Sequence, residues 1–294
     1  MRNTIFVTGA SGQLGQLVIK HLLARGVAAN RIIAGTRSPD KLADLVAKGI
    51  EVRKADFEDT SGLTEAFKGV GTVLIISTDA LDANQTRLKQ HRNAVSAAVA
   101  AGVERIAYTS MPDPAKSLLS FAPDHLGTEQ AIEATGLPHL FFRNSWYHEN
   151  LLRALPNALK SGQWYTAAPV GKTSYVGRDE IAEAIAAALA TPTSESKTYT
   201  LTGSEALSHE EIAALASQAT GKPVTVVPVT DEQFAAGLKS AGVPDVFVDL
   251  MASIETEVRA GNLSIVTNDV EHLIGRRPKP LAAYLNESKA SYAG

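Results

Sequence analysis

Short apolar runs alternate along the first half of the chain with stretches in which apolar residues recur every three or four positions. The first run, residues 4–8, is uncharged and rich in β-branched residues, which predicts a buried strand of a parallel sheet. Similar runs predict five further strands, at residues 31–36, 51–53, 72–77, 105–109 and 140–142. Strands that alternate with helices are typical of right-handed βαβ units. The pattern predicts an α/β fold with a Rossmann-type doubly wound parallel sheet.

Helical periodicity fills the intervals between these strands. One helix is predicted from apolar residues between Leu14 and Leu23, another starts at Ser38 as N-cap with Pro39 in its first turn, and a long one covers residues 84–101. Beyond residue 150, helices are predicted at residues 179–190, 208–220, 231–241 and 244–260, with short strands at 198–201 and 224–227.

This change of rhythm predicts two regions. Residues 1–150 form the sheet domain, and residues 151–294 form a smaller, mainly helical C-terminal part, some segments of which return to the sheet. The polar tail from Glu287 onward is expected to fray.

Composition narrows the class of protein. The net charge is -3 and the 28 Lys and Arg residues are scattered, so nucleic acid is not an expected partner. There is no cysteine, and the seven histidines lack the spacing of metal ligands, so no metal is expected. No apolar run is long enough to span a bilayer, and no signal-peptide pattern opens the chain. We expect a cytoplasmic protein without a membrane partner, either a monomer or a homodimer.

A glycine-rich turn follows the first predicted strand directly and precedes a helix. Gly9, Gly12 and Gly15 are spaced three apart. In dinucleotide-binding folds the first glycine permits a tight turn, the second lets backbone amides approach a pyrophosphate, and the third allows close helix packing. The helix N-terminus adds a positive dipole end for the anion. A glycine-rich surface loop is the alternative, but the strand, turn and helix context favours a dinucleotide site.

The end of the second predicted strand indicates which dinucleotide binds. Folds that prefer NAD usually carry an acidic residue there, whereas this chain has Arg37, followed by Lys41. A guanidinium pairs with a phosphate and has no acceptor for a ribose hydroxyl. Arg37 could also be a solvated loop residue, but its position favours NADP (NADPH) as the cofactor.

These features, with Asp56 and three later strings, resemble one group of proteins. The strings are residues 90–93 (QHRN), 106–110 (IAYTS) and 143–150 (RNSWYHEN). The chain resembles the NmrA-like atypical short-chain dehydrogenases, and among them the bacterial type-2 NAD(P)H:quinone oxidoreductases and then the triphenylmethane reductases. The resemblance runs to about residue 260, and residues 143–150, with residues 90–93 upstream, are its more specific part.

The resemblance implies a set of cofactor contacts. The pyrophosphate would lie against the glycine turn, Arg37 would meet the 2′-phosphate and Asp56 the adenine amino group. Residues at the ends of the fourth and fifth strands would approach the two riboses, and Asn144 the nicotinamide ring. The full set implied is Thr8, Gly9, Ser11, Gly12, Gln13, Leu14, Gly15, Arg37, Asp56, Ile76, Ser77, Thr78, Thr109 and Asn144.

The catalytic Tyr and Lys of ordinary short-chain dehydrogenases are missing, because none of the seven tyrosines has a Lys four residues later. Phe121 and His125 stand at the matching positions. His125 is either a general acid, since histidine titrates near neutrality, or simply a histidine on a helix surface. Ser110 could donate a hydrogen bond to the substrate, and Asn144 completes the set near the reacting ring. Trp146 and Tyr147 could form a flat wall for an aromatic substrate or serve packing alone, and Tyr108 is expected to face the core.

The missing acid discriminates between substrates. Hydride added to a simple carbonyl makes an alkoxide whose conjugate acid has a pKa of ~16, whereas hydride added to a quinone makes a phenolate with a pKa of ~10. The difference of roughly six units is worth about 8 kcal/mol. The sequence therefore predicts an NADPH-dependent oxidoreductase for quinones or similar electron-poor aromatics, which orients the two rings and leaves protonation to solvent.

Two other functions remain open. One is a non-catalytic, NADP-binding redox sensor of the NmrA type, which would bind the cofactor without turnover. The other is a reductase, isomerase or epimerase for a different metabolite, which the missing Tyr and Lys disfavour.

Overall fold

The computed structural model describes residues 2–82 and 85–292, and a seven-stranded sheet is its central element. The strand order is β3-β2-β1-β4-β5-β6-β9, and β1 to β6 pair in parallel. This confirms the predicted α/β fold. The bounds of the strands are β1 Ile5–Val7, β2 Ile32–Thr36, β3 Glu51–Lys54, β4 Thr72–Ile75, β5 Arg105–Ser110, β6 His139–Asn144 and β9 Lys197–Leu201.

Contacts between residues divide the chain into two units. The first comprises Met1–Met111, Pro123–Arg143 and Ile181–Tyr199, and the second comprises Pro112–Ala122, Asn144–Glu180 and Thr200–Gly294. Each unit is therefore assembled from three separate segments. The sequence predicted a boundary at residue 150, with some later segments returning to the sheet.

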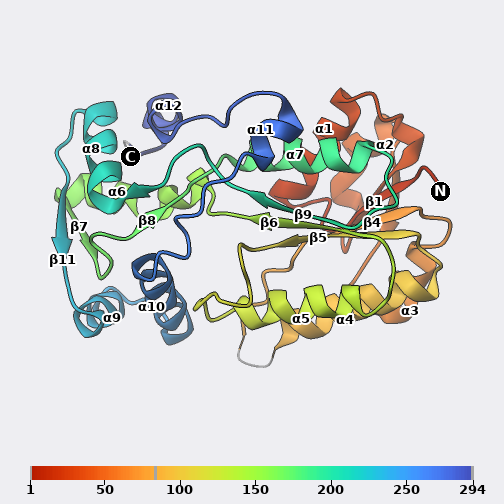
Figure 1. Ribbon diagram of the computed structural model, residues 1–294, viewed down its shortest axis with the longest axis horizontal. Coiled ribbons are helices and arrows are strands. Elements are labelled where there is room, and N and C mark those ends of the chain that lie inside the picture. The colour runs from red at the N-terminus through yellow and green to blue at the C-terminus, as the bar shows by residue number, and fades with distance from the viewer. Residues whose placement is uncertain (1, 83–84, 293–294) are drawn as a thin grey trace. The chain divides into compact units, whose positions relative to one another are not determined.

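Helices cover both faces of the sheet in the first unit. Figure 1 shows α3, α4 and α5 on one face and α1, α2 and α7 on the other. The predicted helix at 84–101 is α4, although Asn84 lies outside the described residues. The bounds are α1 Gln13–Ala24, η1 Ala29–Arg31, η2 Pro39–Leu42, α2 Ala43–Ala47, α3 Thr60–Ala66, α4 Thr86–Ala100, α5 Ala122–Glu133 and α7 Arg178–Ala190.

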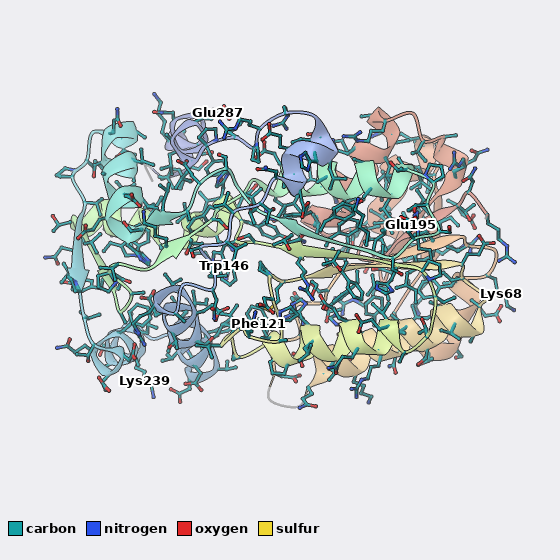
Figure 2. All side chains as sticks on the ribbon, in the orientation of Figure 1. Lys68, Phe121, Trp146, Glu195, Lys239 and Glu287 are labelled. Atoms are coloured by element: carbon teal, nitrogen blue, oxygen red, sulfur yellow. The ribbon has the colours of Figure 1, made fainter. Side chains whose placement is uncertain are left out.

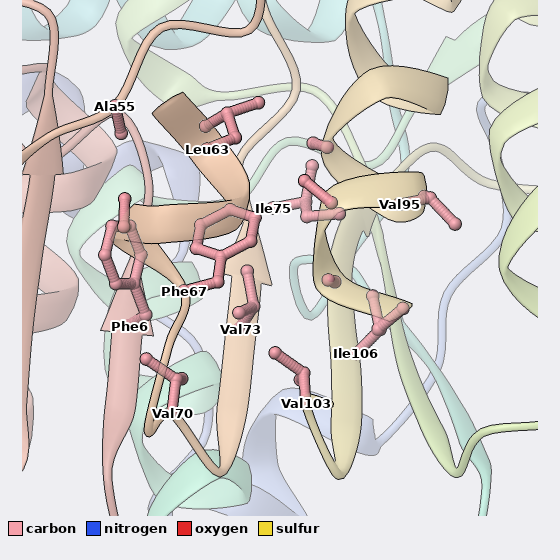
Figure 3. Packing of buried hydrophobic residues seen from close by; sticks show 14 of the residues in the cluster. Phe6, Ala55, Leu63, Phe67, Val70, Val73, Ile75, Val95, Val103 and Ile106 are labelled. Carbon is pink, nitrogen blue, oxygen red and sulfur yellow. The ribbon is translucent and has the colours of Figure 1, made fainter. Parts of the chain in front are cut away.

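An apolar cluster between the sheet and the helices of one face forms the core of this unit (Figure 3). Phe6 of β1 meets Phe67 edge to face, with ring centroids 4.9 Å apart. Val73 and Ile75 of β4 and Ile106 of β5 continue the cluster along the sheet. Burying a side chain of this size stabilises the fold by about 1.5–3 kcal/mol. The core therefore holds the strands in place, and with them the loops that start where the strands end.

The second unit is mainly helical, with two small sheets in which β11 pairs in parallel with β7 and β10 antiparallel with β8. Capping boxes at Ser208 and Thr230 start two of its helices, α8 and α9. The bounds are η3 His148–Arg153, α6 Leu155–Ser161, β7 Gln163–Thr166, β8 Lys172–Thr173, β10 Leu207–Ser208, α8 His209–Thr220, β11 Thr225–Pro228, α9 Asp231–Ser240, α10 Asp245–Arg259, α11 Asp269–Ile274, α12 Leu281–Glu287 and α13 Lys289–Tyr292.

The prediction for the C-terminal tail was wrong. The tail beyond Glu287 does not fray up to residue 292, because it forms α13 and Tyr292 is 2% exposed in a cluster with Leu155 and Leu285. Burial of the Tyr292 side chain stabilises this end of the chain, although the residues around it are polar. At the start of η2, Ser38 is the N-cap residue and Pro39 lies in the first turn, as predicted, although the Ser38 side chain makes no capping bond within the described helix.

Among the described residues, no helix is long and apolar enough to cross a membrane.

Candidate functional site

The glycine turn between β1 and α1 has the geometry that its spacing predicts. Gly9 has a φ of +59°, a conformation that side chains disfavour, and its carbonyl accepts from the Gly12 N–H at 2.9 Å. A Cβ at Gly15 would lie 2.4 Å from the Gly9 oxygen, so only glycine lets the helix pack this closely. The Ala10 N–H donates to the Gly35 carbonyl at 2.9 Å and holds the turn against β2.

The N-terminus of α1 is open to an anion. No side chain among the described residues caps it, and its first turn contains no acidic residue. The first amides of a helix have no partner within the helix, so those of Gln13 and Leu14 remain available beside the exposed Gly12.

Thr36 joins the glycine turn to the loop that carries Arg37. This buried last residue of β2 has its hydroxyl 3.0 Å from the Ser11 hydroxyl and 3.1 Å from the Ser38 N–H, which donates to it. Arg37 is exposed immediately beyond it, and Lys41 is exposed in η2. The structure thus brings Ser11 and Arg37 to the same edge of the sheet, where both could contact one nucleotide.

The backbone of the loop after β4 is fixed by hydrogen bonds to side chains of neighbouring elements. Its three successive N–H groups, at Ile76, Ser77 and Thr78, donate at 2.8–3.0 Å to the side chains of Thr8, Thr109 and His91. The Thr8 hydroxyl also donates to the Leu74 carbonyl, which ties β1 to β4. The strand order reverses between these two strands, and open α/β sheets bind ligands at such a point.

Several buried polar atoms at these strand ends have no hydrogen-bond partner among the described residues. In the first unit they are the hydroxyls of Thr78 and Ser110, and in the second the side-chain oxygen of Asn144. A buried polar atom left unpaired costs about 1–3 kcal/mol, and its usual explanation is a ligand or water that completes it. All three were predicted from the sequence to face the cofactor or substrate.

Asp56 follows β3 and is half-buried. One carboxylate oxygen accepts from the Glu58 N–H at 3.1 Å, which fixes the side chain within its own loop. Its other oxygen can accept a hydrogen bond from a further donor, such as an exocyclic amine.

His125 is not on the helix surface, so that interpretation was wrong. It is 4% exposed on α5, and its Nδ1 lies 2.8 Å from the hydroxyl of Tyr108, which faces the core as predicted. Burial, then the positive charge of Arg87, lowers the pKa of His125 well below 6.5, and burial raises the pKa of Tyr108. At neutral pH His125 is therefore uncharged and hydrogen-bonded to the tyrosine hydroxyl.

The aromatic residues of the string 143–150 lie in the second unit and are only partly exposed. The guanidinium of Arg178 lies 4.7 Å from the centre of the Tyr147 ring. Trp146, which is labelled in Figure 2, packs against Ala168 and against Val258 of α10. Trp146 thus has a packing role whatever else it contacts.

Two contributors to the site were missed by sequence reasoning. His91 and Thr128 are fully buried and hydrogen-bonded to each other, and His91 also holds the β4 loop. The only available signal was the string QHRN at residues 90–93, which carried a resemblance without a role.

Known proteins share this architecture over nearly the whole chain. The model of the NmrA-like family matches residues 1–284. Quinone oxidoreductase 2 of Escherichia coli is 38% identical over 95% of this chain and 96% of its own length. The crystal structure of the E. coli NADPH-dependent quinone oxidoreductase with NADPH superposes with a TM-score of 0.92 and 38% identity, covering 97% and 99% of the two chains. The Citrobacter triphenylmethane reductase solved with NADP(H) gives 0.90 and 37%, covering 97% and 100%.

Proposed function

The chain belongs to the NmrA-like family, and from this premise we propose that it is an NADPH-dependent oxidoreductase that reduces a quinone or a similar electron-poor aromatic. The observation that carries the proposal is the uncapped start of α1 next to the exposed Arg37, in a chain whose relatives include a quinone oxidoreductase. The first feature suits a diphosphate and the second an additional phosphate.

The residues at the sheet edge fit such a cofactor. The amides of Gln13 and Leu14, with the glycine turn and Ser11, would hold the pyrophosphate. Arg37 would pair with the 2′-phosphate, and Asp56 would accept from the adenine amino group. The unpaired hydroxyls of Thr78 and Ser110, in the first unit, would make polar contacts to the riboses, and the unpaired oxygen of Asn144, in the second unit, is the candidate contact for the nicotinamide amide. When bound, NADPH supplies the hydride.

The protein itself supplies orientation and no strong acid. Because His125 is neutral and bonded to Tyr108, it is a poor proton donor at pH 7. A quinone suits such a site, since its reduced form is a phenolate with a pKa of ~10 and can take its proton from water. The Ser110 hydroxyl, which has no partner among the described residues, is free to donate to the substrate oxygen.

Tyr147 is the residue that we propose for the aromatic wall. Arg178 stacks on one face of its ring, which restrains the ring. A rigid ring loses little conformational freedom when an aromatic substrate stacks on it.

A direct assay tests the proposal. NADPH and a benzoquinone are mixed with the protein, and the nicotinamide absorbance is followed. Loss of absorbance well above the uncatalysed rate is expected. Tight binding of NADPH without turnover of any quinone tested would instead identify a redox sensor, and the absence of NADPH binding would refute the proposal.

The proposal also covers the location, the oligomeric state and the partners of the protein. We propose a cytoplasmic monomer or homodimer that takes a small-molecule substrate and has no nucleic-acid or membrane partner. Sedimentation of the purified protein, with and without NADPH, measures its oligomeric state.

A further inference from the structure

The string QHRN at residues 90–93 lies on α4, and three of its four side chains contact loops at the carboxyl edge of the sheet. His91 bonds to the loop after β4, while Gln90 and Asn93 bond to the loop after β3. The helix does not need these bonds to dock, because Ala94, Val95, Ala97 and Ala98 already bury its apolar face in the core. The polar side chains therefore serve the loops.

His91 acts as a fixed acceptor for the loop after β4. Its Nε2 lies 3.0 Å from the Thr78 backbone nitrogen, and an N–H can only donate, so Nε2 carries no proton. Burial, then the charge of Arg87, lowers the pKa of His91 to about 3, which keeps the ring neutral. The remaining ring proton is on Nδ1, which donates to the Thr128 hydroxyl at 2.9 Å.

The ring is also held from its far side. The Thr128 hydroxyl donates to the Asp124 carbonyl at 2.6 Å, so it presents a lone pair to His91. The Tyr108 hydroxyl lies 3.4 Å from the same Nδ1 and its ring packs edge-on, with centroids 5.4 Å apart. These contacts leave His91 with one orientation, and Thr78 is fixed accordingly.

Asn93 and Gln90 fix the loop after β3 in a parallel way. The Asn93 amide donates to the Phe57 carbonyl at 2.9 Å, and the Gln90 amide donates to the Glu58 carboxylate at 3.3 Å. Both partners directly follow Asp56, whose carboxylate bonds to the Glu58 N–H. The Phe57 ring meets the His91 ring edge-on at 6.5 Å, which joins the two braces.

We propose that His91 and Asn93 are positioning residues that set the spacing between the loops carrying Asp56 and Thr78, and thereby the affinity for the adenosine half of the cofactor. This inference rests on the proposed NADPH site. In this proposal His91 affects cofactor affinity only by fixing the position of Thr78. It makes no direct contact with the cofactor and transfers no proton.

Binding of 2′,5′-ADP, which carries only the adenosine half, tests the inference by calorimetry alongside NADPH. His91→Leu leaves the Thr78 N–H without an acceptor, so we expect both dissociation constants to rise by the same factor, on the order of tenfold. His91→Gln restores an acceptor and should recover most of the affinity. Ser96→Ala, an exposed change on the same helix, is the control.

Two further readouts separate positioning from stability. In His91→Leu, amide hydrogen exchange should accelerate at residues 76–78 in the free protein, and the KM for NADPH should rise by more than kcat falls. Asn93→Leu should weaken 2′,5′-ADP binding through the other loop, and it serves if His91→Leu does not fold. Unchanged 2′,5′-ADP affinity in a folded His91→Leu or Asn93→Leu protein would overturn the inference. If the wild-type protein binds neither ligand, the proposed cofactor site itself fails.

Discussion

A single side chain, Arg37, is expected to decide which nicotinamide coenzyme is preferred. It is exposed just beyond Thr36, which is bonded to the glycine turn, and a guanidinium recognises a phosphate but not a hydroxyl. Arg37→Glu should weaken NADPH binding by roughly 10- to 100-fold, the loss of a charge-assisted pair, and NADH binding much less. Fluorescence titration with both coenzymes measures this.

The matched control for that change is Lys68→Glu, which reverses a charge in the turn before β4, at the opposite edge of the sheet (Figure 2). It should alter neither affinity by more than about twofold. Equal losses of NADPH and NADH affinity in Arg37→Glu would argue against a phosphate contact.

We expect that kcat has no pH dependence caused by protonation of His125. The burial and the Arg87 charge that lower its pKa keep it neutral from pH 6 to 8, so it provides no ionising acid in that interval. His125→Gln retains a hydrogen-bonding partner for the Tyr108 hydroxyl, and the shape of its kcat profile against pH should match that of the wild type. A wild-type pKa near 6.5 that disappears in this variant would show that His125 is the acid after all.

The residues that the sequence could identify are those whose role is local. The glycine turn is one, since spacing alone defines its geometry. His91 and His125 are the opposite case, because what matters is burial beneath strands and helices distant in sequence, and no local pattern distinguishes a buried helix histidine from an exposed one. The unpaired oxygens of Ser110 and Asn144 were predicted only through the family resemblance.

At the scale of an element, substitutions of two glycines in the same turn are expected to have different effects, one on NADPH binding and the other on stability. Gly12 has an ordinary φ of -83°, and an added Cβ would lie 3.2 Å from the Gly9 oxygen, so Gly12→Val should fold but crowd the pyrophosphate and abolish NADPH binding. Gly15→Ala places a Cβ 2.4 Å from the same oxygen and should destabilise the protein by about 1–3 kcal/mol. Urea unfolding and NADPH titration on both variants separate the two effects. Normal binding by Gly12→Val would refute the role of the turn.

Element types were predictable and their ends less so. The fourth strand was predicted to run to Ser77 but ends at Ile75, because side chains rather than a neighbouring strand take the next N–H groups. The short helices of the second unit, such as η3 and α6, lack a long periodic stretch and were not predicted. At α13, the docking of Tyr292 on residues far back in the chain decides the structure.

For the whole molecule, buried neutral histidines predict acid sensitivity. The pKa is lowered to about 3 in His91 and to about 4 in His148, and well below 6.5 in His125, in each case chiefly by burial. The unfolded chain takes up these protons near pH 6.5 and the folded chain does not. Stability is therefore complete above pH 6.5 and falls as the pH drops toward 3–4.

His91 and His148 should each remove about 2 kcal/mol of unfolding free energy between pH 7 and pH 5, and His125 adds to this loss in the same direction. A loss of this size is a large part of the total stability of a typical domain, about 5–15 kcal/mol. Urea midpoints at the two pH values measure the loss, and His125→Gln, which cannot take up the proton, should lose less. Equal midpoints at pH 7 and pH 5 in the wild type would contradict the prediction.

The placement of β9 beside β6 governs the order in which the sheet can close during synthesis. β6 ends at Asn144 and β9 begins at Lys197, so at 5–20 residues per second a ribosome needs roughly 3–10 s to make the intervening chain. During that interval β6, with Leu140, Phe141 and Phe142, is an unpaired strand edge of the kind that recruits other chains. Nascent or truncated chains that stop short of residue 197 are thus the aggregation-prone form of this protein.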